Sequence, residues 1–229
     1  IPWKGEEEVL DPDDFYFAIR VKAPDSEPQV RILAAKEKSE IDQLYANSFL
    51  KNVDELNYIG EFPFVKIKYK TDLPLDIQLD AFSPFIPLDI KNSAIPVAVL
   101  TFTVKNASKR DLEVSFLAGL VNPVGKEVRE GQAVNEVVQN DQRTAIEMTA
   151  KDIPENHYQY QGSMALSCLK TGQERISYRA YQYLVPELTA IGSSGEEYWR
   201  MFLGTGELDN KERTELPPLP SFLQGWTDR

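Results

Sequence analysis

Apolar and polar residues alternate along much of the chain, which is the pattern of strands with one face buried. In FYFAIRVK, residues 15–22, every second side chain is apolar, and the turn sequence APDSEP leads on to QVRIL, residues 29–33. These two segments predict a hairpin. The segments FVKIKYK and PLDIQLDA, residues 64–70 and 74–81, set an apolar face against lysines or aspartates. We therefore expect strands that pack on a core with one face and meet water with the other.

Two further segments, VAVLTFTV at 97–104 and LEVSFLAGLVN at 112–122, are apolar on both faces, and the turn sequence NASKRD joins them. A strand that is apolar on both faces is typical of a sheet covered on both sides, so these segments predict a central hairpin. Further strands are expected at 134–138, 144–148, 162–169 and 176–183. The connections are too short for crossover helices, which favours antiparallel pairing.

Two segments have the spacing of a helix instead. In KSEIDQLYANSFLKNV, the apolar residues within 41–49 fall at helical spacing behind the capping pair Ser39 and Asp42, which predicts a short helix near 39–51. In SSGEEYWRMFLGTGEL, an N-cap serine and an apolar stripe predict a C-terminal helix near 194–203. The expected fold is mainly β, a large antiparallel β-sandwich with these two helices.

The order of the segments divides the chain into three parts. Residues 1–14 are expected to be an N-terminal extension that is truncated, because the chain opens on IPWKGEEEVLDPDD and not on Met. Residues 15–190 are expected to form the sandwich domain, and residues 191–229 a helix with a Pro-rich linker. A helix and a Pro-rich arm behind a sandwich are typical of a junction, so we expect the linker to lead to a domain that this sequence lacks.

Charge and composition exclude several classes of function. The 229 residues include 25 Lys and Arg against 36 Asp and Glu, a formal net charge of -11, which argues against nucleic acid or an anionic membrane as a partner. The single cysteine, Cys168, excludes an internal disulfide, and the single histidine, His157, argues against a zinc site or a Ser-His-Asp triad. We expect neither a metal nor a cofactor.

No apolar run reaches the roughly 18 residues of a membrane span, so we expect no transmembrane segment. The protein is expected to be soluble. The sequence leaves its compartment open: periplasmic or secreted if a bacterial leader has been removed, and otherwise cytoplasmic.

Carboxylate pairs are frequent, but none has the context of a catalytic pair. Glycosidase chemistry needs two carboxyl groups about 5–9 Å apart beside a cleft, one of them with a raised pKa. Glu196 and Glu197 lie at the start of a predicted helix, and Asp76 and Asp80 lie on the polar face of a predicted strand. We therefore expect no catalytic residue in this chain.

Tyr158 and Tyr160 border a turn-like stretch and are candidates for stacking on sugar rings. A sandwich rich in tyrosine is ordinary, so a purely structural role is the alternative.

The segment AFSPFIPLD, residues 81–89, joins two predicted strands yet carries large apolar side chains and two prolines. Proline fixes φ and stiffens the loop, and a rigid apolar loop loses little entropy on docking. The segment is therefore typical of a contact with a neighbouring domain. A loop folded back over the edge of its own sandwich fits the same residues equally well.

Four blocks occur in order within about residues 15–208: YIGEFPFVKIKY, LDAFSPFIPLDIKNSAIPVAVLTFTVKN, YQGSMALSCL and GEEYWRMFLGTGEL. They resemble the N-terminal domain of glycoside hydrolase family 116, which holds bile-acid-type β-glucosidases (glucosylceramidases) and bacterial β-glucosidases and β-xylosidases. The resemblance implies a β-sandwich ahead of an (α/α)6 catalytic barrel, and the barrel carries the nucleophile Glu and the acid/base Asp. The front of the chain departs from the family, which usually has a Gly-rich opening there.

The resemblance implies a non-catalytic domain of a retaining β-glucosidase-like or glucosylceramidase-like enzyme, one that supports the barrel and borders the substrate entrance. The fragment alone would not be an enzyme, its partner would be the catalytic barrel of the same chain, and a glycoside would be contacted only indirectly. An independent carbohydrate-binding module is the alternative. The expected interdomain contacts are Phe82, Pro84, Phe85, Ile86, Pro87, Trp199 and Phe202.

Overall fold

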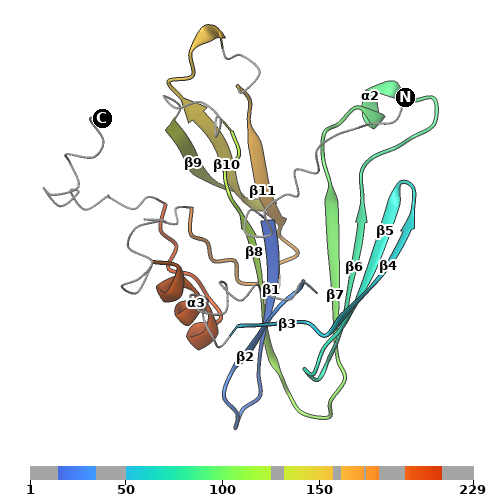
Figure 1. Ribbon diagram of the computed structural model, residues 1–229, viewed down its shortest axis with the longest axis vertical. Coiled ribbons are helices and arrows are strands. Elements are labelled where there is room, and N and C mark those ends of the chain that lie inside the picture. Colours follow the sequence, from blue (N-terminus) through green and yellow to red (C-terminus); the bar gives the residue numbers. More distant parts are fainter. Residues whose placement is uncertain are drawn as a thin grey trace, which may run out of the picture. The chain divides into compact units, whose positions relative to one another are not determined.

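The computed structural model describes residues 15–34, 50–124, 132–156, 161–172, 174–180 and 194–212. It is mainly β with antiparallel sheets, as predicted and consistent with a sandwich (Figure 1). The chain separates into two compact units, residues 1–120 and residues 121–229, and each is described by itself.

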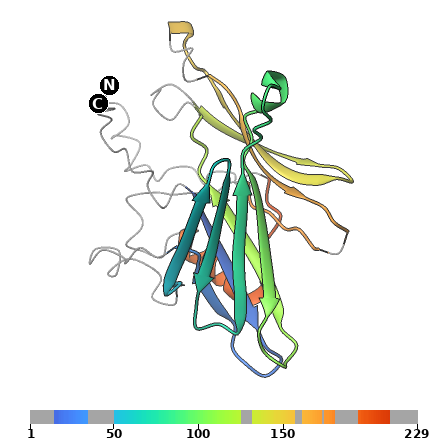
Figure 2. The same ribbon diagram turned by 90° about the vertical axis from the view of Figure 1, so that its right-hand side faces the viewer.

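Unit 1 contains two four-stranded sheets. The first, in the order β3-β2-β1-β8, consists of β1 (Phe15–Lys22), β2 (Gln29–Ile32), β3 (Lys51–Asn52) and β8 (Glu113–Leu120). The second, in the order β4-β5-β6-β7, consists of β4 (Glu55–Glu61), β5 (Phe64–Lys70), β6 (Leu75–Phe82) and β7 (Val99–Asn106) (Figure 2). Neighbouring strands are antiparallel except β2 and β3. The predicted hairpin of residues 15–22 and 29–33 is therefore confirmed.

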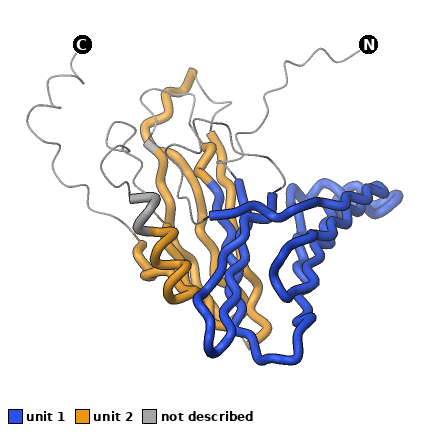
Figure 3. Tube along the Cα trace, turned by 60° about the horizontal axis from the view of Figure 1, so that its bottom comes forward, with its two compact units in different colours: residues 1–120 blue, residues 121–229 orange. Residues whose placement is uncertain are grey.

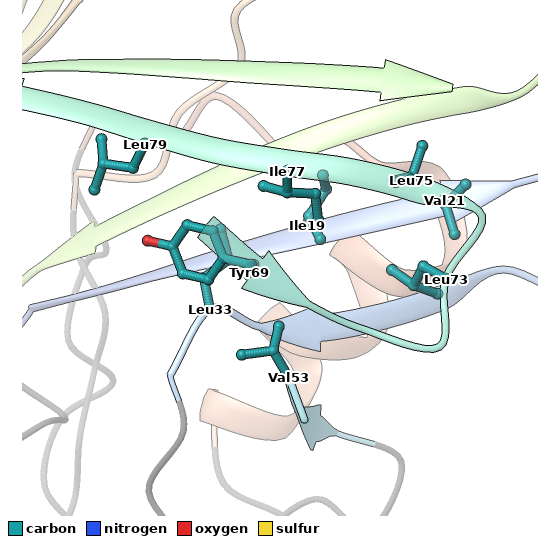
Figure 4. Packing of buried hydrophobic residues seen from close by; sticks show 9 residues of the cluster. All are labelled: Ile19, Val21, Leu33, Val53, Tyr69, Leu73, Leu75, Ile77 and Leu79. Atoms are coloured by element: carbon teal, nitrogen blue, oxygen red, sulfur yellow. The ribbon is translucent and has the colours of Figure 1, made fainter. Parts of the chain in front are cut away.

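The core of unit 1 lies between these sheets, and Figure 4 shows its buried side chains. They are Ile19, Val21, Leu33, Val53, Tyr69, Leu73, Leu75, Ile77 and Leu79. Along β6 the buried residues alternate with polar ones, because successive side chains of a strand point to opposite faces. Burial of each aliphatic side chain contributes about 1.5–3 kcal/mol, and burial raises the pKa of Tyr69 to about 12.

The predicted central hairpin of residues 97–104 and 112–122 is wrong. β7 pairs with β6, whereas β8 pairs with β1, so residues 107–112 carry the chain from one sheet to the other. Phe102 of β7 and Phe116 of β8 are still in contact, with ring centroids 4.2 Å apart. Alternation predicts which side chains face the core but not which strand lies alongside, so both connections fit the same pattern.

Unit 2 contains a three-stranded sheet in the order β11-β10-β9 and the helix α3 (Figure 3). The strands are β9 (Gln132–Gln139), β10 (Arg143–Lys151) and β11 (Met164–Leu169). The helix α3 spans Ser194–Thr205, which confirms the helix predicted near 194–203. Its buried side chains include Tyr198, Trp199 and Phe202.

Two further predicted elements are not confirmed, and some observed elements were not predicted. Most of the helix expected near 39–51 lies outside the described residues, and Lys51 belongs to β3. Residues 176–180 of the strand expected at 176–183 form only an isolated bridge, between Arg179 and Lys211. The strand β4 and the short helix α2 (Ile90–Ser93) were not predicted. The domain boundaries at 1–14, 15–190 and 191–229 stay predictions.

Candidate interdomain surface

The outer face of the second sheet in unit 1 changes from polar to apolar along its strands. The outward positions of β5 are Phe64 at its first residue and lysines after it. The outward positions of β6 are polar except Phe82 at its last residue. The register places Phe64 opposite Phe82, with ring centroids 5.9 Å apart, and Phe82 opposite Val99. Three apolar side chains therefore form a row across one end of this face, whose other outward positions on β5 and β6 are polar.

Two connections continue this apolar character at the same end of the sheet. The β4–β5 turn contains Phe62 and a cis bond to Pro63, and the β6–β7 connection is the segment 83–98. The ring of Phe62 packs edge-on against Phe85 at 5.0 Å, yet the two residues remain 82% and 51% exposed. We call this surface the apolar end. Its exposed large apolar residues are Phe62, Phe64, Phe82, Phe85, Ile86, Leu88, Ile90, Ile95 and Val97.

Hydrogen bonds hold the segment 83–98 in one conformation. The Ser83 hydroxyl donates to the Val97 carbonyl at 2.6 Å and so joins the two ends of the segment. The Ser93 hydroxyl accepts from the Ile86 N–H at 2.9 Å and donates to the Ile86 carbonyl at 3.0 Å. Both backbone groups of Ile86 are thereby paired, while its side chain is exposed.

Within this segment, Asp89 caps α2. Its Oδ1 accepts from the Asn92 N–H at 3.0 Å, and its Oδ2 accepts from the Asn92 side-chain amide. These hydrogen bonds favour the carboxylate and hold the pKa of Asp89 below its usual range. The neighbouring Leu88 has a φ of 69°, in the left-handed region. Hydrogen bonds of Asp89 and Ser93 therefore fix the conformation of this turn, and its apolar side chains are exposed to solvent.

The predicted contact residues fall into two groups. Phe82, Phe85, Ile86 and Pro87 are exposed and Pro84 is half-buried, all of them at the apolar end. Trp199 and Phe202 lie on α3 in unit 2 and are buried, so as they stand they offer little surface to a partner. Contact of any of these residues with a second domain stays a prediction.

Sequence reasoning missed several members of the apolar end. Phe62, Phe64, Leu88 and Ile90 were not singled out, although they are exposed. A signal for Phe64 was present, because a phenylalanine precedes three lysines at the outward positions of one strand. Exposure of Leu88 depends on the backbone of the turn, which residue types alone do not specify.

The other candidates give no site. Tyr158 and Tyr160 lie outside the described residues, so sugar stacking stays a prediction. Asp80 lies on the outer face of β6 and forms an ion pair with Lys66 at 3.5 Å, which is an ordinary surface contact. Cys168 lies in β11, as predicted, but is exposed.

In the part of the chain that the structure describes, no group of three or more His, Cys, Asp or Glu residues is placed to hold a metal ion. None of the described helices is long and apolar enough to cross a membrane.

Comparison with protein families gives a match over nearly the whole chain. The family model described as "beta-glucosidase 2, glycosyl-hydrolase family 116 N-term" matches residues 4–221. The matched range includes the apolar end and the described parts of both units. A search among curated proteins gave no match.

Proposed function

Because the chain belongs to glycosyl hydrolase family 116, whose N-terminal domain it matches, we propose that it supports the catalytic barrel of its own polypeptide. The family assignment fits a non-catalytic domain and implies a catalytic partner domain in the same chain. In this proposal the sandwich packs on the barrel and borders its substrate entrance. Hydrolysis of β-glucosides or glucosylceramide-type substrates belongs to the barrel.

The observation that carries the proposal is the apolar end. Large apolar side chains gain about 1.5–3 kcal/mol each when they are fully buried, and here a cluster of them lies open to solvent. Extended exposed apolar patches mark interaction sites in soluble proteins. The hydrogen bonds of Ser83 and Ser93 hold the segment 83–98 before any partner binds, which lowers the entropy cost of docking.

The chemistry of this surface fits a protein partner. Its exposed side chains are Phe, Ile, Leu and Val, which have no N–H or O–H groups with which to orient sugar hydroxyls. The formal charge of -11 disfavours an anionic membrane. An apolar surface of another protein domain is a partner that needs neither polar side chains nor a positive charge on this surface.

The test uses the full-length enzyme. Substitution of Phe62→Asp together with Phe85→Asp places two charges in the contact, so we expect the sandwich and the barrel to unfold in separate calorimetric transitions. We also expect heat inactivation of aryl β-glucosidase activity at a lower temperature than in the wild type. The matched control is Leu169→Asp, since Leu169 is 69% exposed on β11 of unit 2 and is not a member of the apolar end. Identical melting of the double variant and the control would contradict the proposal.

The carbohydrate-binding module predicted as the alternative has its own signature. It requires saturable sugar binding by this chain that is lost on substitution of Tyr158 or Tyr160. Such binding, together with unchanged melting of the double variant, would favour the alternative over the support role.

A further inference from the structure

The two most exposed apolar side chains of the apolar end lie at the short helix α2. One is Ile90, the first residue of the helix, and the other is Leu88, two positions before it. Leu88 is 105% exposed and Ile90 is 85% exposed. We call residues 86–94 the knob. Both side chains extend into solvent, so neither adds to the packing of unit 1.

The backbone of the knob makes the choice of leucine costly. Leu88 has a φ of 69°, a conformation that glycine and asparagine adopt readily and a branched apolar side chain does not. Local stability therefore favours Asn or Gly at this position. A residue held in such a conformation without packing in its own unit is typical of a functional contact.

The frame behind the knob is polar and paired. The Asp89 N–H donates to the Ile86 carbonyl at 3.0 Å, and the Ser93 N–H donates to the Asp89 carbonyl at 3.1 Å. With the Asp89 cap and the Ser93 hydroxyl, these bonds fix how Leu88 and Ile90 project. A rigid protrusion with exposed apolar side chains loses little conformational entropy when it binds.

We propose that the knob is an anchor that inserts Leu88 and Ile90 into an apolar recess of the catalytic domain of the same chain. The inference rests on the proposed function, from which the occupant follows: the family assignment implies that domain, and the knob is continuous with the apolar end. The charged residues of the knob, Asp89 and Lys91, balance each other, which gives an anionic lipid surface no basic cluster to bind.

The first experiment compares variants of the full-length enzyme by hydrogen exchange. Leu88→Asn removes the anchor but suits the left-handed backbone, so any change in the variant comes from the lost contact and not from added backbone strain. Burial of a leucine corresponds to about a tenfold to hundredfold change in an equilibrium constant, so exchange across residues 86–94 should accelerate by about that factor. Leu169→Asn is the matched control and should leave this exchange unchanged. Unchanged exchange in Leu88→Asn would overturn the anchor.

The second experiment identifies the occupant. Ile90 is replaced by the photoreactive residue p-benzoylphenylalanine in the full-length enzyme, and the cross-linked peptides are sequenced. A cross-link to the catalytic domain of the same chain supports the inference, whereas a cross-link to a second copy or to added lipid vesicles overturns it. No cross-link, while Phe62→Asp with Phe85→Asp still uncouples the domains, overturns the knob and leaves the proposed function standing. If no cross-link forms and the double variant does not uncouple the domains, both the knob and the proposed function are overturned.

Discussion

At the scale of single residues, Arg31 shows how a charge is accommodated on a core-facing position. It lies opposite the fully buried Ile19 in the β1–β2 register and is itself buried. Its Nε and Nη2 donate to the two carboxylate oxygens of Asp72, both at 2.7 Å, and its Nη1 donates to the Val30 carbonyl at 2.7 Å. Paired in this way, a guanidinium can remain in an apolar layer.

Replacement of Asp72 should therefore destabilise the protein. Asp72→Asn leaves the buried Arg31 without its carboxylate, but the Asp72 side chain is 55% exposed, so water replaces part of the interaction. We expect a loss of about 1–2 kcal/mol in the free energy of unfolding near neutral pH, measured by urea denaturation. The control is Asp25→Asn, because the Asp25–Arg110 pair is 3.8 Å long and open to solvent; its loss should be under about 0.5 kcal/mol.

The same pair predicts a pH dependence. The hydrogen bonds from Arg31 hold the pKa of Asp72 below its usual range, so its contribution is fully present above the unfolded pKa of about 3.9. That contribution is lost as the pH falls through the lower, folded pKa. The difference in stability between wild type and Asp72→Asn should therefore shrink toward zero in acid. A difference that stays constant from neutral pH into acid would show that the carboxylate charge plays no part.

At the scale of elements, the sequence predicted that the segment 83–98 is an apolar connection between strands, but it did not predict the helix α2 within it. The prolines and phenylalanines of AFSPFIPLD indicated a stiff apolar connection, and the structure places it between two strands with Phe85 and Ile86 exposed. The helix α2 was missed because it is only four residues long and shows no apolar periodicity. Its stability comes from the Asp89 cap and the Ser93–Ile86 bonds, which require the turn to form first.

Ser93 should therefore be the residue that holds this segment. In Ser93→Ala the Ile86 N–H loses its hydroxyl acceptor and the Ile86 carbonyl keeps only the Asp89 N–H as a donor, which should weaken the local structure by about 0.5–1.5 kcal/mol. Because the segment is exposed, we expect faster hydrogen exchange at the Ile86 amide without a matching loss of global stability. Ser26→Ala is the control, since Ser26 bonds to Ala23 in the β1–β2 turn and should leave the Ile86 amide unaffected. Equal exchange at Ile86 in both variants would contradict this role.

At the scale of the whole molecule, the sequence predicted the mainly β class and most strand positions, because alternation depends on local residues alone. It did not predict which strands pair across long separations, such as β1 with β8, or the separation into two units. Pairing partners depend on how sheets stack, and a hairpin and a sheet-crossing connection need the same residues. The exposed members of the apolar end were only partly predictable, because the exposure of Leu88 depends on the backbone of its turn.

The last prediction concerns catalysis by the chain on its own. A retaining glycosidase needs two carboxyl groups about 5–5.5 Å apart on either side of the scissile bond. The family assignment fits a domain that leaves this pair to its catalytic partner, so residues 1–229 alone should not hydrolyse an aryl β-glucoside. The measurement is release of the aryl group by the purified chain, with the full-length enzyme as the positive control. Turnover that co-purifies with the chain and is lost in an Asp76→Asn, Asp80→Asn double variant would place catalysis on β6 and overturn the support role.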